Sequence, residues 1–353
     1  MTKLAMIMAG GTGGHVFPAL AVARELSTRG WRIHWLGGNK GIETRAVPEA
    51  GYPMSVLGTQ ALRGQGLVGK LAGALALATA MVRALRVLRR ERPQVVVSLG
   101  GYTAGPGGLA ARLLGIPLVL HEQNAVAGLT NKVLARFAAG IAQAFPNTLP
   151  GGTTTGNPVR AEILALPTPQ QRELGQHSPI RLLVFGGSQG AQALNQAMPA
   201  ALADTDLTLD VLHQAGRGKA ESTLSDYDRH QVQARVVEFV DDMAEAYSWA
   251  DLVIGRSGAL TVSEIAAVGV PAILVPLPIA VDDHQTANGR WLERAGAGEI
   301  LPQDQLAEQL PKRLTSWCTQ PELLQAAADR GRALATSDAT ERLADLIESH
   351  AHV

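Results

Sequence analysis

The chain has 353 residues, of which 46% are hydrophobic, 18% charged and 4% aromatic, with 38 glycines and one cysteine. This length predicts two domains of ordinary size, and the composition is that of a globular protein. The lone Cys318 excludes an internal disulfide framework, which favours a reducing compartment. Because the apolar stretch Leu4–Ala9 is too short for a signal peptide, we expect no export.

The net charge of zero hides a strong asymmetry between the two halves of the chain. Residues 1–150 hold 16 Lys and Arg against 5 Asp and Glu, a charge of +11, whereas residues 151–353 hold 15 against 26, a charge of −11. A basic half is typical of a protein that faces a phospholipid surface, a diphosphate or a nucleic acid. The alternative is that the two domains differ in charge by chance and that the basic half faces no anionic partner.

The first half begins with the pattern of a strand, a glycine loop and a helix. The apolar run Leu4–Ala9 predicts a strand, Gly10–Gly14 a loop, and Pro18–Leu26 a helix. Short aliphatic runs then alternate with longer helical stretches, which is typical of a buried parallel sheet. These runs span residues 33–36, 95–98 and 118–121.

The segment 67–90 has a different pattern. Residues 71–82 are all Ala, Leu, Gly, Thr, Met or Val, and arginines follow at 83, 86, 89 and 90. The apolar part is too short to cross a bilayer, for which a helix needs about 20 apolar residues. The pattern predicts either a core helix with one wetted end or a helix at an anionic membrane surface, and the surrounding positive charge favours the membrane.

The second half repeats the order of the first. A strand at Arg181–Phe185 leads into the loop Gly186–Gly190 and a helix at Ala191–Leu202, and further strands are expected at 209–213, 236–239, 252–255 and 272–275. Two such starts predict an α/β protein with two doubly wound parallel-sheet domains. Prolines at 158, 167 and 169 predict a linker, which gives domains 1–162 and 163–338. The last helix, within 339–353, is expected to return to the first domain.

Both glycine loops offer groups that bind anions. Gly10–Gly14 lacks the dinucleotide-binding spacing, and no Lys-Ser/Thr follows it, so dehydrogenase and ATPase functions lose support. Exposed N–H groups at the start of the next helix favour anions or polar oxygens. His15, beside this loop, can take a proton at neutral pH, although a packing or capping histidine is the alternative. The loop Gly186–Gly190, with the Ser188 hydroxyl, suits a diphosphate.

The segment Arg256–Glu264 follows an expected strand, at the strand end where open parallel sheets bind ligands. Glu264 is placed to accept hydrogen bonds from both hydroxyls of a ribose, unless it is a solvated helix residue. Polar clusters at 121–124 and 282–285 also follow strands. We interpret Asp204–Asp206 and Asp226–Asp228 as surface turns rather than metal sites, and no Cys/His cluster has zinc spacing, so we expect neither a metal nor a cofactor.

Six stretches together carry a resemblance to a known family. They are Gly10–Ala19, Gly100–Tyr102, His121–Asn124, Gly156–Arg160, Gly186–Ala191 and Arg256–Glu264. In this order, and almost end to end, they resemble the MurG family of bacterial glycosyltransferases. The resemblance implies a GT-B fold, in which two Rossmann-like domains face each other across a cleft. The second domain would hold most of the donor, and the first the lipid acceptor.

The resemblance also implies an activity. N-acetylglucosamine would pass with inversion from UDP-N-acetylglucosamine to the C4 hydroxyl of undecaprenyl-pyrophosphoryl-MurNAc-pentapeptide (lipid I), giving lipid II for peptidoglycan. The enzyme would lie peripherally on the cytoplasmic face of the bacterial inner membrane, on an anionic surface, and would bind no nucleic acid. The alternatives are another UDP-sugar enzyme on the same scaffold, such as a glycolipid synthase or an epimerase, and a non-catalytic nucleotide-sugar sensor.

In the first domain, the resemblance assigns roles around the glycine loop. His15 matches the general base that acts on the acceptor hydroxyl. Thr12, Gly13 and Gly14 match residues that shape this loop and the donor-sugar side of the site. Asn124 matches a residue that contacts sugar.

The other assigned residues match contacts to the nucleotide sugar. Arg160 and Ser188 match diphosphate contacts, and Val240 matches the position whose backbone meets the uracil. Glu264 matches the ribose contact, and Gln285 a contact to the donor sugar. The remaining positions of the nucleotide-contacting segment are Ala259, Leu260, Thr261, Val262 and Ser263.

Overall fold

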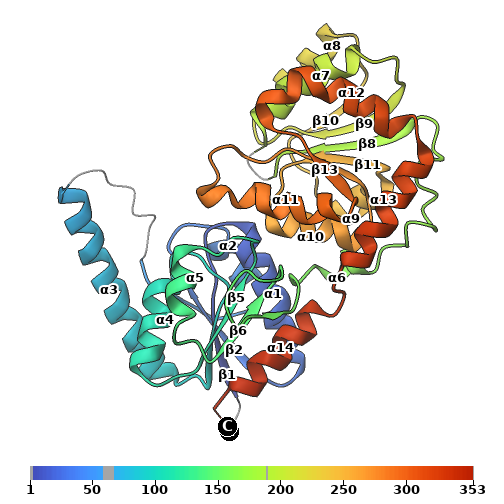
Figure 1. Cartoon of the computed structure of the whole chain (residues 1–353). Coiled ribbons are helices and arrows are strands. Elements are labelled where there is room, and N and C mark those ends of the chain that lie inside the picture. Colours follow the sequence, from blue (N-terminus) through green and yellow to red (C-terminus); the bar gives the residue numbers. More distant parts are fainter. Residues whose placement is uncertain (1–2, 59–66, 188–189, 353) are drawn as a thin grey trace. The chain divides into compact units, whose positions relative to one another are not determined.

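The computed structural model of the chain describes residues 3–58, 67–187 and 190–352, with all their side chains except those of residues 67–72, 74 and 281. The chain divides into two units (Figure 1). Unit 1 comprises Met1–Arg160 and Thr336–Val353, and unit 2 comprises Ala161–Ala335. The last helix therefore belongs to the same unit as the first strand.

Unit 1 is built on a parallel sheet. Within the described residues its strands are β1 (Leu4–Met8), β2 (Arg32–Gly37), β3 (Met54–Val56), β4 (Val95–Ser98), β5 (Leu118–Glu122), β6 (Gly140–Gln143) and β7 (Thr153–Thr154). They lie in the order β3-β2-β1-β4-β5-β6-β7. Connections leave β1 and β4 toward opposite edges of the sheet, so the carboxyl ends of these two neighbours form a topological switch point, where such sheets bind ligands.

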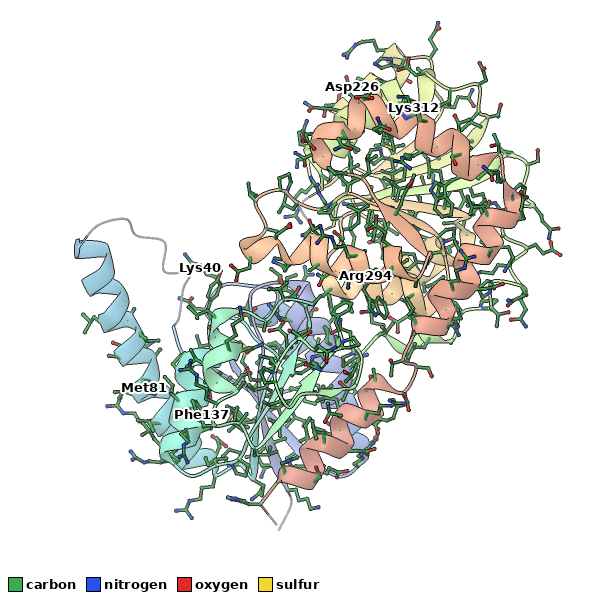
Figure 2. All side chains as sticks on the ribbon, viewed as in Figure 1. Lys40, Met81, Phe137, Asp226, Arg294 and Lys312 are labelled. Carbon is green, nitrogen blue, oxygen red and sulfur yellow. The ribbon has the colours of Figure 1, made fainter. Side chains whose placement is uncertain are left out.

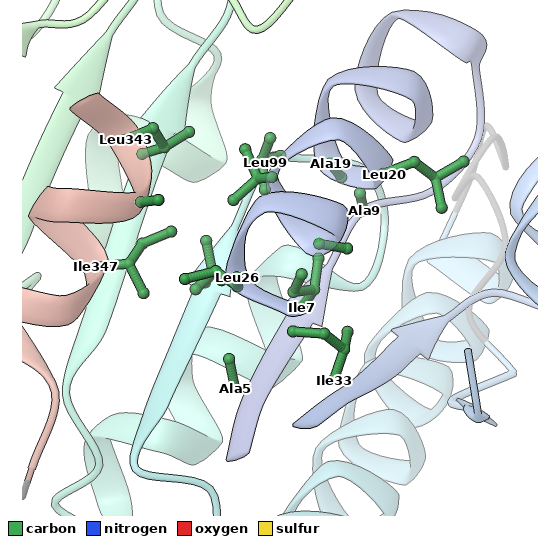
Figure 3. Close-up of a cluster of buried hydrophobic side chains, with 14 of the residues drawn as sticks. Ala5, Ile7, Ala9, Ala19, Leu20, Leu26, Ile33, Leu99, Leu343 and Ile347 are labelled. Carbon is green, nitrogen blue, oxygen red and sulfur yellow. The ribbon is translucent and has the colours of Figure 1, made fainter. Parts of the chain in front are cut away.

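Helices cover both faces of this sheet. They are α1 (Gly13–Thr28), α2 (Glu43–Glu49), α3 (Leu67–Glu91), α4 (Ala104–Leu113), α5 (Leu129–Leu134) and α14 (Ala339–His350). Helix α14 packs beside α1, and Figure 3 shows its Leu343 and Ile347 pointing into the cluster that contains Leu26 and Leu99. Burial of these side chains explains why the end of the chain joins unit 1.

Helix α3 has one buried and one exposed face. Ala80, Ala84 and Leu88 recur every four residues and are buried in the cluster on the other face of the sheet, next to α4. Met81 and Phe137 border the same cluster (Figure 2). Apolar side chains exposed on α3 are Leu75, Leu77 and Val82. The buried face fits the core prediction for this segment, and the membrane prediction stays a prediction.

Unit 2 repeats the topology of unit 1. Within the described residues its sheet consists of β8 (Ile180–Phe185), β9 (Leu209–Gln214), β10 (Arg235–Val237), β11 (Leu252–Gly255), β12 (Ala272–Leu274) and β13 (Gly298–Ile300), all paired in parallel. The order is β10-β9-β8-β11-β12-β13, which puts the switch point between β8 and β11. The predicted class of two doubly wound parallel sheets is confirmed.

The helices of unit 2 complete the layers. They are α6 (Ala161–Leu164), α7 (Gln192–Ala203), α8 (Ala220–Arg229), α9 (Met243–Trp249), α10 (Ala259–Val268), α11 (His284–Arg294), α12 (Leu306–Cys318) and α13 (Pro321–Leu334), with short 3-10 turns at Val281–Asp283 and Gln303–Gln305.

Three local predictions differ from the structure. Helix α1 begins at Gly13, before the predicted Pro18, and β10 ends at Val237, before the predicted Phe239. The turn predicted at Asp226–Asp228 is wrong, because these residues lie in α8 with Tyr227 fully buried between them. Asp226, labelled in Figure 2, forms a surface ion pair with Arg229 one turn further along the helix.

Candidate functional site

The glycine loop of unit 1 lies at the switch point and leads directly into α1. Thr12 occupies the N-cap position with extended backbone, and Gly13, Gly14 and His15 form the first turn of the helix. A Cβ atom on Gly101 would lie 2.5 Å from the Gly10 carbonyl oxygen, so the loops after β1 and β4 touch through their backbones. This close contact explains the glycines on both sides of the switch point.

The His15 imidazole is held from two strand ends. Its Nδ1 atom lies 3.2 Å from Oε1 of Gln123, which follows β5. One face of the ring packs on Gly100, where a Cβ atom would be 3.0 Å from Nδ1. Gln123 is itself buried and donates from Nε2 to the Leu99 carbonyl at 2.7 Å. His15 is partly exposed, so the ring is oriented and still accessible.

A buried carboxylate accepts a hydrogen bond from the backbone of the glycine loop. Glu43, in the first turn of α2, is 1% exposed. Its Oε2 accepts from the Gly11 N–H at 2.9 Å and its Oε1 from the Gly38 N–H at 3.2 Å. Gly11 has a φ of +93°, a conformation that favours glycine. Our sequence analysis missed Glu43, because nothing local marks a carboxylate whose partner lies 32 residues earlier.

A second buried carboxylate shapes the loop that carries Asn124. Glu122 ends β5, and its Oε1 accepts from the backbone N–H of Asn124 at 2.9 Å. Its Oε2 accepts from Asn131 Nδ2 at 2.8 Å and from the Gly128 N–H at 3.2 Å. Asn124 is therefore set on the loop after β5, the strand next to β4.

The second histidine of this region has a different environment. His121, within β5, is fully buried, and its Nε2 donates to the Gly156 carbonyl at 2.9 Å. Burial lowers its pKa to about 4, so the ring is neutral at physiological pH. Of these two histidines, His15 is the one that a substrate hydroxyl can reach.

In unit 2, the loop after β8 was predicted to hold a diphosphate. Ser188 lies outside the described residues, so its predicted contact stays a prediction. On either side of it, Gly187 and Gly190 have φ angles of +79° and +66°. A Cβ atom on Gly190 would collide with the Ala215 carbonyl, so Gly190 itself packs closely against the residue that follows β9.

Helix α10 begins at the neighbouring strand end, after β11. Its N-cap is Gly258, which has no side chain to cap the N–H groups of the first turn, and such N–H groups attract anions. Glu264 is 5% exposed, and Tyr247 donates to its Oε2 at 3.3 Å. The Tyr247 ring is fixed in turn by an edge-to-face contact with Phe185. The carboxylate thus has a defined orientation.

The other residues of the predicted nucleotide-contacting segment are not equivalent. Leu260 and Thr261 are partly exposed in the first turn of α10, and Ala259 begins the helix. The Val262 side chain is fully buried, which leaves only its backbone for a ligand. The Ser263 hydroxyl donates to the Ala259 carbonyl at 2.9 Å, as serine often does inside helices.

Two side chains brace the loop after β12. Gln285, in the first turn of α11, accepts from the Leu277 N–H at 2.9 Å through Oε1, so its Nε2 is the group that can donate to a ligand. Arg256 donates to the carbonyls of Val275 and Pro276, both at 3.1 Å. Its other terminal nitrogen donates to Gln303 Oε1 at 2.7 Å, so both terminal nitrogens have partners within the protein.

The last two predicted residues are Val240 and Arg160. Val240, 9% exposed, follows β10 at the edge of the sheet, so its backbone is the part available to a base. Arg160 is partly exposed at the end of the first segment of unit 1. In the part of the chain that the structure describes, no cluster of His, Cys, Asp or Glu could hold a metal ion, and no helix is long and apolar enough to cross a membrane.

Two family models match the chain. The glycosyltransferase family 28 N-terminal domain covers residues 5–143, and the glycosyltransferase family 28 C-terminal domain covers residues 181–346. A curated UDP-N-acetylglucosamine–N-acetylmuramyl-(pentapeptide) pyrophosphoryl-undecaprenol N-acetylglucosamine transferase from Pseudomonas paraeruginosa is 51% identical over 346 residues, 96% of each chain. The enzyme of the same name from Stutzerimonas stutzeri is 50% identical over 358 aligned positions, covering 100% of each chain.

Solved structures are similar over the whole length as well. The structure of Acinetobacter baumannii MurG superposes with a TM-score of 0.87 at 42% identity, covering 98% of this chain and 99% of that one. A glycotransferase of kitacinnamycin superposes with a TM-score of 0.73 at 16% identity, which shows a shared fold alone.

Proposed function

The chain belongs to glycosyltransferase family 28, and we propose that it is the N-acetylglucosaminyltransferase for which its relatives are named. It transfers N-acetylglucosamine from UDP-N-acetylglucosamine to N-acetylmuramyl-(pentapeptide) pyrophosphoryl-undecaprenol (lipid I), which gives lipid II for peptidoglycan synthesis. The observation that carries this proposal is the identity of 50–51%, which runs through both units and nearly from end to end. The resemblance noticed in the sequence is thereby confirmed.

The chemistry requires a base for the acceptor and a stabilised leaving group. His15 takes the proton from the C4 hydroxyl of the acceptor sugar as that oxygen attacks the anomeric carbon. The bond from this carbon to the diphosphate breaks, its electron pair stays on the β-phosphate oxygen, and the centre inverts. The partly exposed, oriented ring of His15 supports this role, whereas His121 is fully buried and committed to the Gly156 carbonyl. Thr12, Gly13 and Gly14 shape the loop that presents the base.

Unit 2 binds the nucleotide sugar. The uncapped first turn of α10 directs N–H groups toward the diphosphate, which compensates its charge without a metal. Glu264, oriented by Tyr247, accepts from the two ribose hydroxyls. The Val240 backbone meets the uracil, and Gln285 donates to the donor sugar.

The remaining contacts follow the family pattern at matching positions. Arg160 and Ser188 bind the diphosphate, and Asn124 binds sugar. The segment of α10 that borders the nucleotide consists of Ala259, Leu260, Thr261, Val262 and Ser263.

The protein attaches peripherally to the cytoplasmic face of the bacterial inner membrane. The exposed face of α3 supports this, because Leu75 and Val82 are 71% and 44% exposed beside the exposed Arg86 and Arg89. Neighbouring helices add Leu113 on α4, 69% exposed, and apolar and basic side chains on α5. Apolar area and basic charge together provide the two contributions that stable binding to an anionic membrane needs.

A transfer assay with two acceptors tests the activity. The protein is incubated with radiolabelled UDP-N-acetylglucosamine and either lipid I or diacylglycerol, and label is followed into the lipid fraction. We expect label in the lipid I reaction only. Label in diacylglycerol alone would make the protein a glycolipid synthase, and nucleotide binding without transfer to either lipid would make it a sensor.

A further inference from the structure

The amide of Gln123 has one possible orientation. The residue is 2% exposed and touches two groups: one end lies 2.7 Å from the Leu99 carbonyl oxygen and the other lies 3.2 Å from His15 Nδ1. A carbonyl oxygen can only accept, so the end at Leu99 must be the NH2 group. The reversed amide would place two oxygens 2.7 Å apart with no hydrogen between them. Oε1 is therefore the atom opposite His15.

This orientation determines where the proton of neutral His15 lies. Oε1 can only accept, so Nδ1 must carry the hydrogen, and the lone pair is left on Nε2. Free histidine favours the opposite tautomer, in which Nε2 is protonated and cannot act as a base. We propose that Gln123 is a positioning residue that holds His15 in the Nδ1–H tautomer and so presents Nε2 to the acceptor hydroxyl. This inference rests on the proposed role of His15 as the base.

The surroundings of Gln123 keep this arrangement in place. Asn157 Nδ2 donates to the Gln123 backbone carbonyl at 3.1 Å, which fixes the chain after β5. Leu99, the second partner, directly follows β4, so the amide is clamped between two neighbouring strand ends. Gly100 packs against the imidazole and supports the ring on that side.

The titratable groups near His15 have other contacts, so Gln123 is the residue that accepts from Nδ1. His121 uses its Nε2–H on the Gly156 carbonyl and has a pKa lowered to about 4 by burial, so it stays neutral. The Glu122 carboxylate accepts from the Asn124 N–H, and the Glu43 carboxylate accepts from the Gly11 and Gly38 N–H groups. Tyr102 borders Gly11 with its ring. Oε1 of Gln123 is the acceptor that the described residues place at Nδ1.

Nitrogen NMR of the full chain tests the tautomer directly. Protein labelled with 15N-histidine is studied at pH 8 by two-bond 1H–15N correlation, and His15→Ala identifies the His15 signals. We expect a protonated Nδ1 and an unprotonated Nε2 in the wild type, and a shift toward protonated Nε2 in Gln123→Met. A wild-type ring protonated on Nε2 would overturn the proposal, whatever the variants do.

Kinetics separate positioning from a merely structural role. Gln123→Met should lower kcat about 10- to 100-fold while leaving the KM for UDP-N-acetylglucosamine within about twofold, because the donor is bound by unit 2. Gln123→Glu keeps an acceptor oxygen at Nδ1 but places its second carboxylate oxygen opposite the Leu99 carbonyl oxygen, so it should recover only part of the rate. It should also move the acidic limb of the kcat/KM profile to higher pH, because a carboxylate favours the charged imidazole.

Each outcome decides the proposal. Full kcat in Gln123→Met with an unchanged tautomer would refute it. If Gln123→Met does not fold, judged by circular dichroism and UDP binding, the wild-type spectrum and Gln123→Glu still decide. Full transfer by His15→Ala would remove His15 as the base, whereas the tautomer measurement would stand independently, so failure of the two proposals can be told apart.

Discussion

The two switch points share a topology but differ in what surrounds the glycine loop. In unit 1, buried polar side chains converge on one imidazole: Gln123 holds the ring of His15 and Glu43 holds its loop. In unit 2, α10 begins after β11 with Gly258, which has no side chain, at its N-cap, and it carries the oriented carboxylate of Glu264. The same scaffold thus orients a titratable group in one unit and collects donors and acceptors in the other.

This difference suggests a division of roles, in which unit 1 supplies the proposed base and unit 2 the proposed contacts to the nucleotide. A group that acts on the acceptor proton matters in the transition state, so its loss lowers kcat. A group that contacts the ribose binds the ground state and the transition state alike, so its loss raises KM. Substitutions at the residues that orient His15 should therefore change kcat, and a substitution at Glu264 should change the donor KM.

The largest expected effect is at His15. His15→Ala should lower kcat by about 10²–10⁴-fold and leave the dissociation constant of UDP nearly unchanged, because the base is lost while unit 2 is intact. Steady-state kinetics with lipid I, together with calorimetric titration of UDP, measure both quantities. A loss of UDP affinity equal to the loss of rate would end the proposed division between the units.

The next effect concerns the loop that carries the base. In Glu43→Gln, one of the two backbone N–H groups at the carboxylate loses its acceptor and meets an NH2 group instead. We expect kcat to fall about 10- to 100-fold through misplacement of His15, with the donor KM nearly unchanged. Glu49→Gln, at the exposed end of the same helix, is the matched control and should behave as wild type. A raised donor KM in Glu43→Gln would contradict the comparison.

Acid should weaken both units, because each buries one histidine. Burial lowers the pKa values of His121 and His213 from 6.5 to about 4. The unfolded chain binds these protons first, so their contribution is complete above pH 6.5 and is lost as the pH falls toward 4. At pH 5 each histidine should reduce the free energy of unfolding by about 2 kcal/mol. Urea unfolding at pH 8 and pH 5 measures this loss.

The environment of His213 provides the control for the acid effect. Its Nδ1 lies 2.9 Å from the Tyr227 hydroxyl and its Nε2 lies 3.2 Å from Asn195 Oδ1, so both nitrogens of the neutral ring have partners, and burial is what disfavours the charged ring. His213→Gln cannot titrate, and its stability should depend less steeply on pH between 6.5 and 4. An equally steep dependence in this variant would assign the acid effect to other groups.

A smaller effect is expected at the ribose contact of unit 2. Glu264→Gln removes the charge from the proposed acceptor of the two ribose hydroxyls and should raise the KM for UDP-N-acetylglucosamine about tenfold, with kcat within about twofold. Glu245→Gln, on the exposed side of α9, serves as the control. A fall in kcat at constant KM would place Glu264 in the chemistry rather than in binding.

Much of this fold follows from local patterns. The strand at Val95–Ser98 is a buried run of aliphatic residues bounded by breakers, and its predicted and observed limits agree. The start of α1 was misplaced because Gly13 and Gly14 disfavour a helix by intrinsic preference, and burial of Val16 further along the same turn overrides that preference. Likewise, Asp226–Asp228 belongs to α8 rather than to a surface turn because Tyr227 is buried.

The candidate site was predictable only in part. His15 and Glu264 stand beside glycine loops at strand ends, which local sequence reveals. Gln123 and Glu43 act on partners 108 and 32 residues away, and no local pattern encodes such pairs. Their roles emerge only once the parallel sheet brings the ends of β1, β4 and β5 together.

The proposed membrane-binding face of α3 gives the smallest expected effect. Arg83 donates to the Leu57 carbonyl and Arg90 pairs with Glu91, so Arg86 is the better test of surface charge on α3. Arg86→Gln should weaken binding to phosphatidylglycerol vesicles by about 1 kcal/mol, or about fivefold, and less in high salt. Arg294→Gln, in the acidic half (Figure 2), should not. Equal weakening in both variants, measured by vesicle sedimentation, would mean that net charge rather than α3 attaches the protein.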